Sequence, residues 1–123
     1  MTYRGACHCG TLSWQFCTSL DVERWTVRCC QCSFCRAHGA RCTSDPDGVV
    51  DFAISDSSVL LRYQFGLKTA EFLVCRSCGV YVGAVMTQSD GSFTTINLNT
   101  MTSEVRDLPE PLTVSYDSED VNR

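Results

Sequence analysis

The stretch CHCG at residues 7–10 has a counterpart in CRSCG at residues 75–79, and together they predict how the chain folds. Structural zinc takes four soft ligands in a tetrahedron, often as two pairs that the fold brings together. A glycine follows each pair, which suits a tight turn with positive φ whose backbone N–H groups face sulfur. We therefore expect a structural zinc bound by Cys7, Cys9, Cys75 and Cys78, tying the N-terminus to a distant segment.

A second cysteine motif, CCQCSFC at residues 29–35, has no partner pair. Cys30, Cys32 and Cys35 would give three ligands on one loop, and three protein ligands with one vacant position are typical of catalytic zinc. Cys29 is the less favoured ligand, because neighbouring side chains on an extended backbone point to opposite sides. The alternatives are a reactive thiol cluster, a disulfide between two of the three, or a shell closed by His38.

A zinc ion with three thiolates carries a formal charge of −1 and is a weak Lewis acid, so it suits activating sulfur better than ionising water. A small thiol could take the vacant position as a thiolate, because soft ligands and a soft substrate atom go together. That thiolate could add to an aldehyde, or leave when a carbon–sulfur bond breaks. We expect Cys30, Cys32 and Cys35 to be the catalytic residues.

The side chains around this motif give tentative substrate contacts. Arg28, Arg36, His38 and Arg41 crowd the loop and could bind the carboxylates of an anionic thiol. They could equally offset the negative charge of the zinc site or lie in solvent. Phe34 lies within the motif and is expected to line the pocket.

The remaining sequence predicts a mainly β domain. Short stretches alternate with period two and are rich in β-branched and aromatic residues. They are TLSWQF (11–16), VVDFAI (49–54), LLRYQF (60–65), AEFLVC (70–75), VYVGAVM (80–86) and FTTINL (93–98). Turn residues lie at 44–48, at Gly66 and at 89–91. We also predict a helical turn at 102–108 capped by Thr102 or Ser103, an edge strand in LTVSY (112–116) and a frayed tail at 117–123.

Composition narrows the class of protein. The 123 residues fit one domain, and ten cysteines without an apolar leader predict metal sites in the reducing cytoplasm rather than disulfides. The formal charge of −4 argues against nucleic-acid binding, and no apolar run is long enough for a membrane span. Cys17, Cys29 and Cys42 are expected to be small buried hydrophobic residues. The residues expected to fill the core are Trp14, Trp25, Phe52 and Phe72.

The motifs GACHCG at 5–10, CxCxxCR at 30–36 and FLVCxxCG at 72–79 resemble those of the glutathione-dependent formaldehyde-activating enzyme family, also called the centromere protein V family. The resemblance runs from Gly5 to about Leu98. It implies a β-tent fold of short, mostly antiparallel sheets, a structural zinc on the first and third motifs, and an active-site zinc on the second. The implied activity is that of S-(hydroxymethyl)glutathione synthase, a carbon–sulfur lyase that joins glutathione and formaldehyde.

Two functions follow as expectations. The first is a zinc-dependent carbon–sulfur lyase that acts on a small thiol, such as glutathione, and an aldehyde. The second is a non-catalytic, zinc-stapled β domain that binds another protein.

Overall fold

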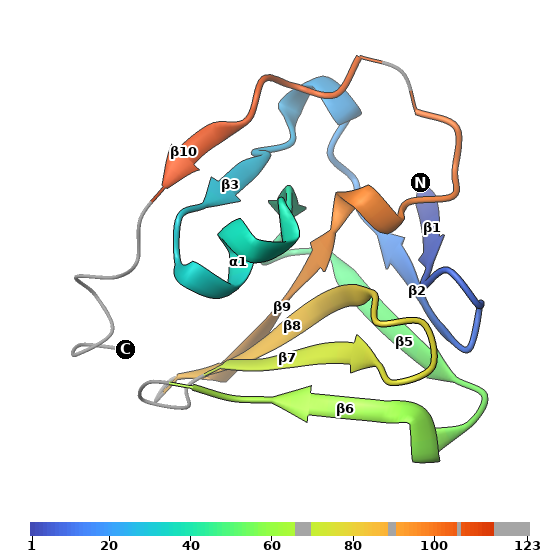
Figure 1. Cartoon of the computed structure of the whole chain (residues 1–123). Coiled ribbons are helices and arrows are strands. Elements are labelled where there is room, and N and C mark those ends of the chain that lie inside the picture. The colour runs from blue at the N-terminus through green and yellow to red at the C-terminus, as the bar shows by residue number, and fades with distance from the viewer. Residues whose placement is uncertain (66–69, 89–90, 106, 115–123) are drawn as a thin grey trace.

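The computed structural model describes residues 1–65, 70–88, 91–105 and 107–114, which form a mainly β structure (Figure 1). The strands are β1 (Thr2–Ala6), β2 (Leu12–Cys17), β3 (Arg28–Cys30), β4 (Cys42–Thr43), β5 (Val49–Ile54), β6 (Leu60–Tyr63), β7 (Ala70–Cys75), β8 (Tyr81–Gln88), β9 (Gly91–Asn97) and β10 (Leu112–Val114). The helices are α1 (Ser33–His38) and three 3-10 turns, η1 (Val22–Arg24), η2 (Ser57–Val59) and η3 (Leu98–Thr100).

The strands form two sheets. One has three strands in the order β1-β2-β5, and the other has seven in the order β10-β3-β4-β9-β8-β7-β6. Only the pairing of β10 with β3 is parallel among the pairings of the described strands. The predicted mainly antiparallel β fold is therefore confirmed, as is the edge strand for Leu112–Val114; residues 115 and 116 of that prediction lie outside the described residues.

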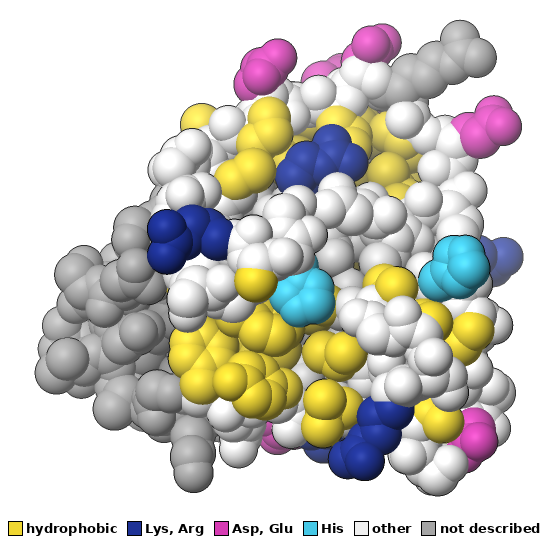
Figure 2. All heavy atoms as spheres, in the orientation of Figure 1, with side chains coloured by type: hydrophobic (Ala, Val, Ile, Leu, Met, Phe, Trp, Pro, Cys, Tyr) yellow, Lys and Arg dark blue, Asp and Glu magenta, His cyan; other side chains and the backbone are white. Residues whose placement is uncertain are grey.

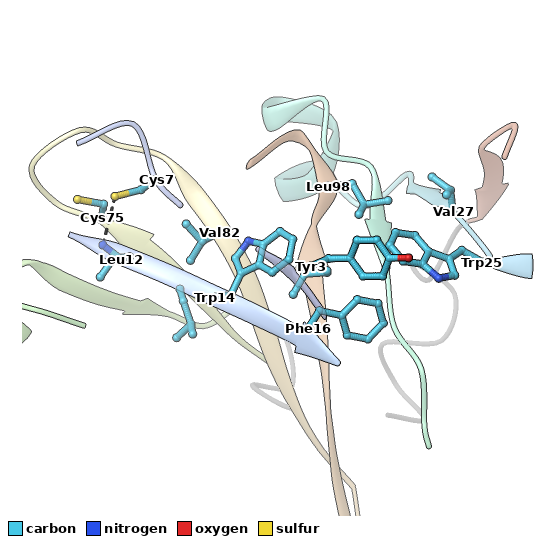
Figure 3. Packing of buried hydrophobic residues seen from close by; sticks show 12 residues of the cluster. Tyr3, Cys7, Leu12, Trp14, Phe16, Trp25, Val27, Cys75, Val82 and Leu98 are labelled. Atoms are coloured by element: carbon cyan, nitrogen blue, oxygen red, sulfur yellow. Dashed lines mark hydrogen bonds between the residues drawn. The ribbon is translucent and has the colours of Figure 1, made fainter. Parts of the chain in front are cut away.

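A hydrophobic core lies between one face of the seven-stranded sheet and the three-stranded sheet. In β2 the alternation of apolar residues buries Leu12, Trp14 and Phe16 on one face. At the far end of this core, Trp25 meets Phe16 and Tyr3 edge to face (Figure 3). Trp14, Trp25 and Phe72 are buried as predicted, and Phe52 packs partly buried against the core.

The opposite face of the seven-stranded sheet packs against α1 and forms a second cluster that contains cysteines and aromatic rings. An irregularity in the β7–β8 pairing helps to build this face, because Leu73 pairs with Gly83 while Val74 pairs with Tyr81. The extra residue, Val82, lets the Tyr81 side chain turn toward α1, as bulges commonly do near functional sites. Hydrophobic side chains of this face also reach the surface below α1, over β7 to β9 (Figure 2).

The predicted helical turn at 102–108 is wrong for the described residues of that stretch, which contain no helix. The backbone there pairs with β1 instead. The N–H groups of Thr102 and Ser103 donate to the Arg4 carbonyl, and the Ser103 hydroxyl accepts from the Arg4 N–H rather than capping a helix. The backbone groups of Thr102 and Ser103 therefore find hydrogen-bond partners at the edge strand β1 instead of in the predicted helical turn.

The predicted turn at 44–48 is present, with a hydrogen bond from Gly48 N to Asp45 O. Gly66, residues 89–90 and the tail at 117–123 lie outside the described residues. The described helices are too short and too polar for any of them to cross a bilayer.

Candidate metal centres

The first candidate centre brings together Cys7, Cys9, Cys75 and Cys78, as the sequence predicts. Their four sulfur atoms lie within 4.8 Å of one another. The Sγ atom of Cys9 is 3.7 Å from that of Cys7 and 3.6 Å from that of Cys75. Zn–S bonds of 2.3 Å in a tetrahedron place the sulfur atoms about 3.8 Å apart, so the donor set and its spacing fit Zn²⁺.

Two similar turns hold these cysteines. Cys7 N donates to Leu12 O at 2.8 Å, and Cys75 N donates to Val80 O at 3.0 Å. Gly10 and Gly79 close the turns with φ of 84° and 77°, which confirms the expected positive φ after each pair. Cys7 and Cys75 face one another at one end of the core (Figure 3), where the Leu12 N–H also donates to the Cys7 sulfur at 3.3 Å.

The cysteines of this group differ in their pKa values. A hydrogen bond from the Thr11 hydroxyl, followed by one from the Thr11 backbone, lowers the pKa of Cys9 to about 6. Burial raises the pKa of Cys75 to about 11. Burial also opposes ionisation of Cys78, but N–H donors of Cys9 and Val80 lower its pKa. A divalent cation would stabilise all four as thiolates, because metal binding and deprotonation are coupled.

The second candidate centre brings together Cys30, Cys32 and Cys35, whose sulfur atoms also lie within 4.8 Å of one another. The sequence predicted that all three lie on one loop, and this prediction is wrong. Cys30 ends β3, Cys32 is the N-cap of α1, and Cys35 lies inside the helix. The Cys35 N–H donates to the Cys32 sulfur at 3.4 Å, so one side chain serves as helix cap and as candidate ligand.

When no cation is present, ionisation of more than one of these three thiols would place negative charges close together, which is unfavourable. The hydrogen bond to Cys30, and then burial, raise the pKa of Cys35. Burial raises the pKa of Cys32. Three soft donors within one small cluster fit a thiophilic ion such as Zn²⁺. Among the described residues, no histidine or carboxylate joins this group, and His38 lies outside it.

Aromatic side chains pack in one cluster with the three-cysteine group, and the sequence assigned only Phe34 among them to a pocket. The ring of Phe34 lies 4.4 Å from Phe72, 5.1 Å from Tyr81 and 4.6 Å from His38, measured between centroids. Tyr81 is 2% exposed, and burial raises its pKa well above the usual value. Aromatic residues on alternating positions of the predicted strands were the available signal, but only the fold places them beside α1.

The basic residues around the motif have different surroundings. Arg28 donates to the Ser44 hydroxyl at 2.7 Å, and Arg41 donates to the Asn99 side-chain oxygen at 2.8 Å. Arg36 and His38 are exposed on α1. Of the tentative substrate contacts, Arg36, His38 and Phe34 therefore all lie on the helix that carries Cys35.

The other three cysteines differ in burial. Cys42 is buried, as predicted, and burial raises its pKa to about 11. Cys17 and Cys29 are only partly buried, so that expectation is wrong for them. Cys17 ends β2 on the face of Ser13 and Gln15, opposite the core, because side chains alternate along the strand.

Comparison with known proteins supports the fold. A crystal structure of a Rhodobacter sphaeroides protein matches with a TM-score of 0.66 and 29% sequence identity. The match covers 90% of this chain and 99% of that one. No protein-family model and no curated protein matches the chain.

Proposed function

We propose that the protein is a zinc-dependent enzyme of the carbon–sulfur lyase type, which acts on a small thiol or on its adduct with an aldehyde. The motifs it shares with the glutathione-dependent formaldehyde-activating family make glutathione and formaldehyde the reference substrates. The supporting observation is an asymmetry in ligand number. One group offers four sulfur atoms, enough for a tetrahedral ion, and the other offers three.

When bound by Cys30, Cys32 and Cys35, Zn²⁺ would supply a position at which a substrate thiol loses its proton and becomes a better nucleophile. The overall reaction adds the thiol across the aldehyde carbonyl. The new bond joins sulfur to carbon, and the thiol proton ends on the carbonyl oxygen; the reverse direction breaks the same bond.

The chain's own residues would position the substrate and limit access of water. Phe34, Phe72 and Tyr81 pack in one cluster with the three cysteines, and their rings would exclude water from that part of the group. Arg36 and His38 are exposed on the same helix, where a guanidinium or imidazolium group can bind a substrate carboxylate. The helix thus carries both a candidate ligand and candidate substrate contacts.

The decisive test compares Cys32→Ser with Cys29→Ser in zinc-loaded protein. Serine retains a cap for α1 but removes the soft donor, so Cys32→Ser should fold and lose turnover to the uncatalysed rate. Cys29 lies outside the group, and its variant should keep at least half of the wild-type rate. The measurements are S-hydroxymethyl adduct formation by mass spectrometry and folding by circular dichroism. Full activity in a folded Cys32→Ser variant would refute the proposal.

X-ray absorption at the zinc edge tests the vacant position separately. A variant with Cys9→Ser and Cys78→Ser, which leaves the four-cysteine centre only two sulfur donors, should leave the remaining zinc with three sulfur neighbours and one lighter, exchangeable neighbour. Four protein ligands at that ion would instead support the non-catalytic protein-binding domain.

A further inference from the structure

Five aromatic rings form a continuous platform beside the three-cysteine group. Phe34 is its centre, with ring centroids 4.4 Å from Phe72, 5.1 Å from Tyr81, 5.5 Å from Tyr63 and 6.2 Å from Phe65. The Phe34 and Tyr63 rings are nearly parallel, at 25°. Phe72 and Tyr81 are buried beneath, so the outer rings rest on a packed layer.

This platform is continuous with the candidate metal ligands. Phe34 lies in α1 between Cys32 and Cys35. The cysteines and four of the rings belong to one packed cluster, whose partly buried members include Cys30, Phe34 and Phe65. Tyr63 joins this cluster through its ring contact with Phe34. A molecule held through its sulfur atom at the three-cysteine group would therefore have the platform as a neighbouring wall.

The outer part of the platform is open to solvent. Tyr63 is 44% exposed on β6, the last strand of the seven-stranded sheet, and Phe34 and Phe65 are half-buried. Exposed hydrophobic side chains gather on this side of the molecule, below α1 (Figure 2). Contiguous apolar surface beside a candidate reactive group is typical of a ligand subsite, and flat rings bind flat ligands by stacking.

The basic side chains near the group differ in their surroundings. Arg28 and Arg41 hydrogen-bond to Ser44 and Asn99, which leaves Arg36 and His38 as the exposed basic side chains of α1. A ligand with one aromatic group and one carboxylate would use both the aromatic platform and the exposed basic side chains.

The geometry points to an aromatic subsite: Phe34, Tyr63 and Phe65 bind an aromatic group that the thiol substrate carries. That the ligand is a thiol follows from the proposed function, on which this assignment rests. The aromatic subsite narrows the substrate class to small aromatic thiols and their aldehyde adducts.

A binding experiment without turnover tests the subsite first. The probe is 3-phenylpropanoate, an aromatic acid with no sulfur, titrated into zinc-loaded protein and followed by NMR of the aromatic side chains. The probe should shift the Tyr63 ring signals, and Tyr63→Ala should weaken its binding about tenfold. Val49→Ala, on the other sheet and 55% exposed, is the matched control and should bind as the wild type does. Unchanged affinity in Tyr63→Ala would overturn the assignment.

Kinetics then separate the two proposals. With formaldehyde, 2-phenylethanethiol should react about tenfold more efficiently than 2-mercaptoethanol, and Tyr63→Ala should remove this preference while leaving 2-mercaptoethanol within twofold. Equal efficiency for both thiols with no probe binding would overturn the subsite and leave the lyase proposal standing. Probe binding at Tyr63 without turnover of any thiol would support the subsite and refute the lyase proposal.

Discussion

At the scale of single residues, two glycines enable the four-cysteine turns. Gly10 and Gly79 have φ of 84° and 77°, where a side chain with a Cβ atom is strained. A Cβ atom at either position would meet no other atom within 4 Å, so the constraint is conformational rather than steric.

Replacing Gly79 with alanine should lower the free energy of unfolding by about 1–2 kcal/mol, because alanine rarely adopts this backbone conformation. Gly79→Asn should cost less, since asparagine tolerates the left-handed region. Urea denaturation of zinc-loaded protein measures both. Equal stability of the alanine and asparagine variants would show that φ is not the constraint.

Cys42 gives a prediction for pH dependence. Burial raises its pKa from 9.0 to about 11. Below pH 9 the thiol is protonated in the folded and unfolded chain alike, but between pH 9 and 11 only the unfolded chain releases the proton. The free energy of unfolding should therefore fall in this window by about 1.4 kcal/mol per pH unit more in the wild type than in Cys42→Ala. Urea denaturation from pH 8 to 11 measures the difference, and identical pH dependence in both proteins would contradict the prediction.

At the scale of elements, cross-strand packing positions the three-stranded sheet. Gly5 in β1 lies directly opposite Trp14 in β2. The indole lies over the glycine, and its Nε1 donates to the Thr100 hydroxyl at 2.8 Å, which links the sheet to η3. A Cβ atom at Gly5 would collide with the indole ring.

Gly5→Ala should destabilise the protein by about 1–3 kcal/mol, because the buried indole must move and strain its contacts. Ser13→Ala on the same sheet, which points away from the core, should change stability by less than about 0.5 kcal/mol. Thermal denaturation of both variants gives the comparison. A Gly5→Ala protein as stable as Ser13→Ala would mean that the indole moves without cost.

At the scale of the whole molecule, the four-cysteine group connects distant parts of the chain. Cys9 and Cys75 are 66 residues apart, and their sulfur atoms lie 3.6 Å apart. One pair follows β1, and the other begins at Cys75, the last residue of β7, so a bound ion would hold the two sheets together at one end of the core.

The two centres should therefore respond differently to loss of a ligand. Cys7→Ser should lose one of two zinc ions and lower the melting temperature by more than about 10 °C, whereas Cys32→Ser should lose the other ion with a smaller decrease. Elemental analysis of zinc per chain and thermal denaturation provide the readouts. Wild-type zinc content in Cys7→Ser, or an equal loss of stability in both variants, would contradict the assignment of a structural and an open site.

Much of the fold and of the candidate metal sites could be predicted from the sequence, because they depend on patterns among residues that are close together along the chain. Alternation in TLSWQF predicted the buried face of β2, and the glycines after each cysteine pair predicted positive φ. The choice of Cys30 over Cys29 followed from strand geometry and agrees with the sulfur cluster. The helix at Ser33–His38 was missed because six residues are too short to show helical periodicity.

Tertiary structure alone decided the rest, because it depends on contacts between residues far apart in sequence. Residues 102–103 pair with β1 because a sheet edge offered hydrogen bonds there. Tyr63, Phe65 and Tyr81 meet Phe34 only because strand pairing and the irregularity at Leu73 and Val74 bring their rings to α1. Local chemistry thus determined which residues could bind a metal, and long-range packing determined which rings lie beside them.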